Sequence, residues 1–150
     1  MTLAAHEQRL AQSDALRFAF ALACVERVRH LLEDEPVIRC LDTLGAYVAG
    51  QVNRDVLDRA ASDAGALANH HQGSRSLDGV GHAAVSASYA VANALAGRAI
   101  QAADYAAYAV VYGEGGYGAV GDPESFVPEK SWQLATLERL ASDQNKLLER

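Results

Sequence analysis

The amino-acid sequence predicts an all-α protein, a compact bundle of about six helices built around an alanine-rich central pair. Half of the residues are hydrophobic and thirty of the 150 are alanine, the best helix former, whereas only three prolines interrupt the chain. Apolar residues recur at steps of three and four in successive segments, which is the spacing of one helix face. A β-sandwich or an α/β enzyme would favour valine, isoleucine, threonine and aromatic residues instead.

Six segments carry this helical pattern, and most of them have a recognisable start or stop. We expect a short turn over 4–12 and then helices over about 14–33, 36–50, 54–72, 78–95, 99–112 and 129–148. Pro36 suits the first turn of the second helix, Asn53 can cap the third, and Gly73 ends it. Ser76 or Asp78 can cap the fourth helix.

Charge density divides these helices into an inner pair and an outer set. Residues 76–121 hold four charged side chains, namely Asp78, Arg98, Asp104 and Glu114. A helix that is apolar almost all round is normally enclosed by other helices. We therefore expect the fourth and fifth helices to form the centre of the bundle, with Gly97 at the corner between them.

The length suits one domain, and we expect residues 1–150 to form a single helical domain. The expected exception to helix is a long loop over 113–128, which holds five glycines and two prolines. Its first residues satisfy the dinucleotide pattern G-x-G-x-x-G, but an alanine-rich helix precedes them where that pattern needs a strand. We therefore expect no nucleotide and no other cofactor.

The charge balance and the cysteines limit the classes of partner. A net charge of −6 disfavours a nucleic-acid binder, which needs a basic face. The charge-free run over 79–97 is rich in alanine and too weakly hydrophobic to span a membrane, and the first residues do not resemble a signal peptide. Cys24 and Cys40 are expected to be free thiols. These features predict a cytoplasmic protein that binds neither nucleic acid nor membrane.

The candidates for catalysis or metal binding are isolated residues. The adjacent His70 and His71 point about 100° apart on a helix, so they do not share one ion easily, and His82 lies further along the chain. Asp104 stands in a nearly charge-free helix, where it can be a tuned general acid, a buried salt-bridge partner or the one residue facing water. We expect no metal site and no catalytic residue. The alternative is a small helical enzyme or ligand-binding domain with a pocket near His82 and Asp104.

Tyrosines are the most informative polar residues. Tyr105, Tyr108 and Tyr112 recur at steps of three and four on one helix face, either packing against the last helix or forming a recognition surface. The recognition hypothesis joins them to acidic residues and to a tyrosine of the loop, and it places partner binding at Tyr108, Tyr112, Glu114, Tyr117, Asp122 and Glu124.

The last helix contains the only tryptophan of the chain. We expect Trp132 to be a structural anchor that packs on the fourth or fifth helix, while Glu129 and Lys130 beside it stay in water.

The segment GHAAVSASYAVANALAGRAIQAADYAAYAV, followed after the loop by EKSWQLATLERL, resembles the putative immunity protein family of bacterial toxin–immunity systems. That family combines an alanine-rich helical pair with a charged residue and a W-Q dipeptide at the start of a terminal helix, which Glu129, Trp132 and Gln133 match. The resemblance covers most of the chain from about residue 14. It implies a helical, non-enzymatic protein that neutralises a cognate toxin by direct binding. It leaves open whether the chain forms a homodimer.

Overall fold

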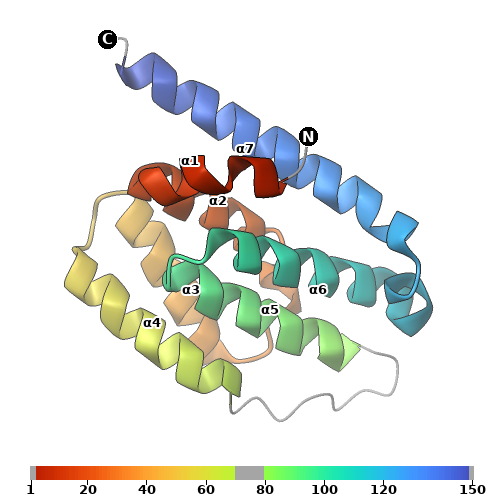
Figure 1. The fold of residues 1–150 in the computed structure, drawn as a ribbon. Helices are drawn as coiled ribbons and strands as arrows, with labels where there is room; N and C mark the ends of the chain where they lie inside the picture. Colours follow the sequence, from red (N-terminus) through yellow and green to blue (C-terminus); the bar gives the residue numbers. More distant parts are fainter. Residues whose placement is uncertain (1–2, 70–79, 149–150) are drawn as a thin grey trace.

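The computed structural model describes residues 3–69 and 80–148, and these ranges are helical without any strand, which confirms the predicted fold class. The described ranges hold seven α-helices and three short 3-10 turns: η1 (Leu3–His6), α1 (Glu7–Gln12), α2 (Asp14–Glu26), η2 (Arg29–Leu31), α3 (Glu35–Val48), α4 (Arg54–Asn69), α5 (Val80–Leu95), α6 (Ala99–Val120), η3 (Pro123–Phe126) and α7 (Val127–Leu148). Figure 1 shows α5 and α6 side by side inside the bundle, with α4 at its edge and α7 lying along it.

Local signals in the sequence account for most helix boundaries. Pro36 lies in the first turn of α3, as expected. The side chain of Asn53 accepts a hydrogen bond from the backbone amide of Val56 at 3.1 Å, which confirms Asn53 as the cap of α4. The helix that begins at Asp14 ends earlier than expected, because the chain tightens into η2 after Arg27. Several predicted positions lie outside the described residues: His70, His71, Gly73, Ser76 and Asp78.

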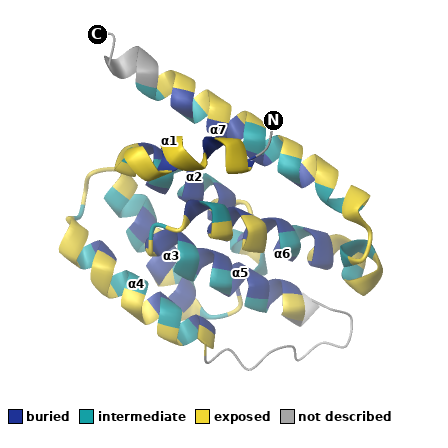
Figure 2. Ribbon diagram, viewed as in Figure 1, coloured by how far each residue is buried: buried dark blue, intermediate teal, exposed yellow. Residues whose placement is uncertain are grey.

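The central pair is confirmed. α5 and α6 pack along each other, and α5 also contacts α2, α3 and α4. Gly97 makes the corner between the two helices with a φ of +81°, in the left-handed region that favours glycine. Small side chains let the two backbones come close, and Figure 2 shows the buried residues gathered on this pair. The buried alanines are Ala83, Ala84, Ala87, Ala90 and Ala94 on α5, and Ala99, Ala102, Ala103, Ala106, Ala107 and Ala109 on α6.

Larger apolar side chains from the outer helices complete the core. Burial of each such side chain stabilises the fold by about 1.5–3 kcal/mol. One of them, Phe18, meets the ring of Tyr47 edge to face, with the ring centroids 5.3 Å apart. Cys24 and Cys40 are buried and free, in agreement with the sequence. The large fully buried residues include Phe18, Phe20, Leu41, Leu44, Leu57, Leu95 and Leu137.

The expected loop over 113–128 is wrong, because most of this stretch is helical. α6 continues through Gly113 to Val120, and after η3 the last helix already begins at Val127. The break is confined to Gly116, whose φ of +64° and ψ of −153° kink α6 before its last turn. Each glycine inside a helix costs only about 1 kcal/mol relative to alanine, and packing of the neighbouring side chains offsets that cost.

Candidate functional site

Five aromatic side chains gather around the kink of α6, and we call them the aromatic cluster: Tyr108, Tyr112 and Tyr117 of α6, His82 of α5 and Phe126 of η3. The ring of Tyr112 lies edge to face with those of Tyr108 and Tyr117, at centroid distances of 4.6 and 5.3 Å. Phe126 reaches Tyr108 at 6.2 Å. These geometries are the favourable ones for aromatic pairs, so the rings hold one another in place.

His82 of α5 contacts the last turn of α6, which follows the kink. Its ring stacks on Tyr112 with the centroids 5.5 Å apart, and its Nε2 atom shares a hydrogen bond with the hydroxyl of Tyr117. Since Gly116 lies between these two tyrosines, the contacts of His82 bridge the kink. A Cβ atom on Gly115 would lie 2.5 Å from the Cβ of Ala119, so this position also needs glycine. The two consecutive glycines are therefore what bring Tyr117 back against α5.

The members of the cluster differ in exposure and in chemistry. Tyr112 is 8% exposed, whereas Tyr117 is 62% exposed. The hydroxyls of Tyr108 and Tyr112 share a hydrogen bond at 3.2 Å, and this bond, together with burial, raises the pKa of Tyr112 to about 12. Tyr112 therefore remains a neutral phenol at ordinary pH. It supports the exposed ring of Tyr117 and does not act as a phenolate base.

Three exposed carboxylates lie within seven residues of the exposed tyrosine in the sequence, and we call Glu114, Tyr117, Asp122 and Glu124 together the α6 tip. Asp122 caps η3 by accepting a hydrogen bond from the amide of Glu124 at 3.1 Å. Residues 99–129 contain no lysine, arginine or histidine. Within the described part of the chain none of the three carboxylates forms an ion pair.

Asp104 and His82 do not share a site. The carboxylate of Asp104 is exposed and accepts a hydrogen bond from the ammonium of Lys130 at 2.6 Å. His82 stacks instead on Tyr112, which lies about 12 Å further along the axis of α6 at the usual helical rise. The alternative of one pocket near both residues is therefore wrong. Of the three interpretations of Asp104, the structure supports the residue facing water, and its ion pair with Lys130 is exposed and not buried.

Trp132 lies against α2 and the core beneath it. The ring is half-buried, and the guanidinium of Arg27, at the C-terminal end of α2, lies 4.3 Å above its centroid. The same guanidinium donates to both carboxylate oxygens of Glu129, at 2.9 Å for Oε2. Glu129 is only 4% exposed, so the expectation that it stays in water is wrong, because Arg27 reaches it from another helix.

The W-Q dipeptide thus connects α7 to two different helices. Gln133 is 1% exposed, and its side-chain amide donates to the backbone carbonyl of Ala103 on α6 at 2.8 Å. Trp132 meanwhile contacts Arg27 on α2. These two contacts fix the last helix against both neighbours.

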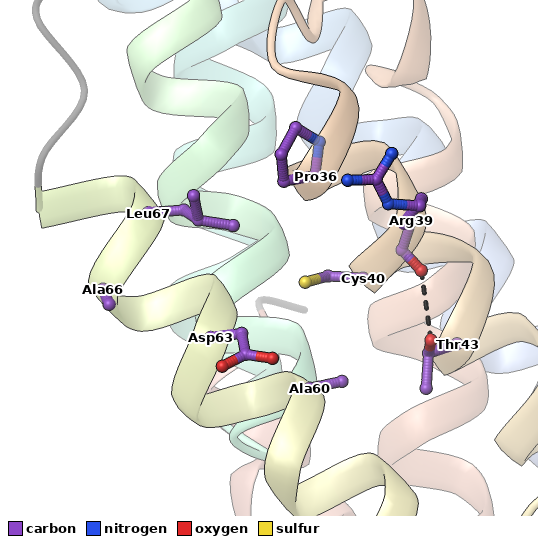
Figure 3. Close-up of a pocket in the computed structure, with 8 residues that line it drawn as sticks. All are labelled: Pro36, Arg39, Cys40, Thr43, Ala60, Asp63, Ala66 and Leu67. Carbon is purple, nitrogen blue, oxygen red and sulfur yellow. Dashed lines mark hydrogen bonds between the residues drawn. The ribbon is translucent and has the colours of Figure 1, made fainter.

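A groove of about 470 Å³ opens between α3 and α4, and Figure 3 shows the thiol of Cys40 pointing into it. Burial raises the pKa of this thiol, and the nearby carboxylate of Asp63 raises it further. A thiol that keeps its proton is a weak nucleophile, so this groove is not arranged for thiol chemistry. Among the described residues, no group of three or more histidine, cysteine, aspartate or glutamate side chains is placed to hold a metal ion.

The structure brings the three predicted tyrosines Tyr108, Tyr112 and Tyr117 together, but it adds members that the sequence did not indicate. Phe126 contacts Tyr108 because η3 folds back onto α6. The sequence analysis expected a loop there and therefore did not predict this contact. His82 joins the cluster from α5, and no spacing in the sequence relates it to Tyr117. Tyr105 lies apart from the cluster and stacks on Tyr89, with the centroids 5.4 Å apart.

Comparison with known proteins identifies the family. The pattern of the family described as Imm-5 like putative immunity protein matches residues 9–140, which is most of the chain. Searches of the curated proteins and of the solved structures returned no significant match. No helix in the described ranges is both long enough and apolar enough to cross a membrane. On the extent of that match, the chain belongs to the Imm-5 like putative immunity protein family.

Proposed function

We propose that this protein is the immunity partner of a bacterial toxin and neutralises it in the cytoplasm by direct binding, without catalysis. Membership of the family supports the partner class. The observation that carries the binding surface is the α6 tip, which contains a tyrosine ring that is 62% exposed and three exposed carboxylates without ion pairs in the described chain. Exposed tyrosines with a polar rim are typical of the residues that dominate binding energy at protein interfaces.

The tip is also held in place before any partner arrives. The ring of Tyr117 contacts both Tyr112 and His82, so binding would freeze little further side-chain motion. Tyr108 and Tyr112 contribute from behind, because they are largely covered and support the exposed ring. In this proposal Glu114, Tyr117, Asp122 and Glu124 meet the toxin, and the remaining members of the aromatic cluster keep them in position.

The experiment is to search the host genome around this gene for a toxin, to express that toxin, and to measure its binding and its toxicity with variants of this protein. Tyr117→Ala should weaken binding by about 30-fold, the loss expected for a residue that dominates an interface. Tyr105→Ala removes another exposed tyrosine of α6 that lies outside the cluster, so it should change the affinity less than about threefold.

Two results would count against the proposal. A wild-type protein that neither binds nor neutralises the toxin would exclude the immunity function. Equal losses for the two tyrosine variants would move the contact surface away from the tip. The mass of the complex, measured by light scattering, shows whether the protein acts as a monomer or as a homodimer.

A further inference from the structure

We propose that the last turn of α6, residues 117–120, is a hinged segment and that His82 is the latch that holds it against α5. The turn then has two forms. In the latched form the ring of Tyr117 lies against His82, and in the released form the turn has moved away from α5. Only the latched form presents the ring to the toxin, so this last step rests on the proposed function and makes His82 a positioning residue for the α6 tip.

The hinge consists of two adjacent glycines. Gly116 has a φ of +64° and a ψ of −153°, a combination that is essentially restricted to glycine, and it is the residue of α6 whose backbone is not helical. At Gly115 a Cβ atom would lie 2.5 Å from the Cβ of Ala119. Rotation about a few such residues moves a segment while the structure before it stays fixed.

Tyr117 is the residue that joins this turn to its surroundings by directional contacts. Its hydroxyl shares a hydrogen bond with Nε2 of His82. Its ring lies 5.2 Å from the ring of His82 and 5.3 Å from that of Tyr112, between centroids. A Cβ atom added at Gly118 would meet nothing within 4 Å, so the turn has open space beside it. The position of the turn therefore depends on the contacts of Tyr117.

The latch lies at the surface of the protein. Tyr117 is 62% exposed, and His82 is exposed as well. Water competes for a hydrogen bond between exposed groups, and exposed segments open at a much lower free energy than the core. The latch can therefore open while α5 and the rest of α6 stay packed.

A second pair of rings joins α5 to α6 without a hinge. Tyr105 of α6 stacks on Tyr89 of α5, with the ring centroids 5.4 Å apart. Tyr105 lies in the regular part of α6, so the helix itself sets its position. Removal of Tyr89 is therefore the matched control for removal of His82.

Backbone order parameters from ¹⁵N relaxation of the full chain measure the latch without the toxin. Residues 117–121 should be rigid in the wild type, at about 0.85, and His82→Ala should lower their order parameters below about 0.6. Tyr89→Ala should leave residues 103–107 rigid. A last turn that is equally rigid in the wild type and in His82→Ala, or mobile in both, would overturn the latch. Circular dichroism confirms that every variant is folded.

Two glycine-to-alanine variants test the hinge. Gly115→Ala places a Cβ atom against Ala119, so the last turn has to shift and should become as mobile as in His82→Ala. Gly118→Ala adds the same methyl group in open space, at a residue without a positive φ, so the turn should stay rigid. Equal order parameters in the two variants would contradict the hinge.

Binding of the toxin tests whether the latch acts through Tyr117. His82→Ala should weaken binding by the factor by which the latched fraction falls, about fivefold where about one molecule in five stays latched. His82→Ala/Tyr117→Ala should bind like Tyr117→Ala alone, because the latch then has no ring to position. A further loss in the double variant would make His82 a direct contact and would contradict its positioning role.

The same measurements keep the latch and the immunity function apart. If the wild type does not bind the toxin, the immunity function is wrong, and the order parameters decide the latch by themselves. If the toxin binds the wild type and His82→Ala equally although the last turn of the variant is mobile, the immunity function stands and the latched form is not the binding form.

Discussion

α5 and α7 both contact α6, but the side chains that they bury have opposite chemistry. α5 presents a row of buried alanines, including Ala83, Ala87 and Ala90. α7 buries Glu129, Gln133 and Thr136 beside Leu137 and Ala141. An interface of alanines sets how closely two helices approach. It contains no directional contact that would fix how far one helix is shifted along the other. A polar interface has directional contacts, so it also sets the register of one helix along its neighbours.

This difference connects the scaffold to the candidate site. Buried polar groups are costly unless they find their partners, so α7 is stable only where Glu129 meets Arg27 and Gln133 meets the carbonyl of Ala103. The residues just before α7 form η3, and η3 packs on α6 and brings Phe126 to Tyr108. The register of α7 therefore helps to place η3, which carries Glu124 of the α6 tip.

The largest effect is expected in the alanine interface. Ala87→Leu adds three carbons at a position that is fully buried in α5, where the neighbouring helices leave no room. We expect a loss of about 3 kcal/mol in the free energy of unfolding, measured by urea denaturation. Ala135→Leu makes the same change at an exposed position of α7 and should be nearly neutral. Equal stability of the two variants would show that α5 and α6 are not closely packed.

The polar interface should respond to removal of one ionic partner. Glu129→Ala leaves Arg27 without its buried carboxylate, but the side chain of Arg27 is 42% exposed and keeps part of its hydration. We expect a loss of about 2–3 kcal/mol, less than for a fully buried pair. The double variant Arg27→Ala/Glu129→Ala measures the coupling between them. Additive losses would show that the pair does not hold α7.

The sequence predicted the alanine interface well because its signal is local. Charge-poor, alanine-rich segments with helical spacing are enclosed whatever their exact partners, so the central pair followed from residues 76–121 alone. The polar interface could not be predicted in the same way. Arg27 and Glu129 are far apart in the sequence, and an acidic residue at the start of a helix usually faces water.

The candidate site was predicted in part, again for a physical reason. Tyr108 and Tyr112 share a helix face by their spacing, and the structure confirms their contact. The glycine content predicted a loop after Tyr112. Most of these glycines instead lie within helix α6, and only Gly116 has a non-helical backbone there. Only that kink brings Tyr117 to His82, and spacing along the chain contains no information about it.

Trp132 tests the anchor of α7 with a smaller expected loss. Its ring is half-buried and covered on one face by Arg27, so Trp132→Ala should lower the free energy of unfolding by about 2 kcal/mol. Trp132→Phe keeps an aromatic face and should lose less than about 1 kcal/mol. Since this is the only tryptophan, unfolding has to be followed by circular dichroism. An unchanged midpoint for Trp132→Ala would make the residue a partner contact and no anchor.

The smallest effect is the pH dependence of the free energy of unfolding that Tyr112 of the aromatic cluster causes, and this dependence appears only at alkaline pH. The pKa of Tyr112 rises from 10 to about 12 on folding, so between these values the folded protein keeps a proton that the unfolded chain releases. The contribution of this tyrosine to stability is therefore complete below pH 10 and is lost as the pH rises to about 12.

Tyr112→Phe removes this dependence together with the hydrogen bond that Tyr112 shares with Tyr108. At neutral pH the variant should be less stable by no more than about 1 kcal/mol, because Tyr108 can turn to water. Above pH 10 the stability of the wild type should fall more steeply than that of the variant, so the difference between them should narrow. Tyr105→Phe, outside the cluster, supplies the comparison for loss of one hydroxyl. Parallel denaturation midpoints of the wild type and Tyr112→Phe throughout this pH range would show that the phenol of Tyr112 is not held by the cluster, and would leave Tyr117 without its support.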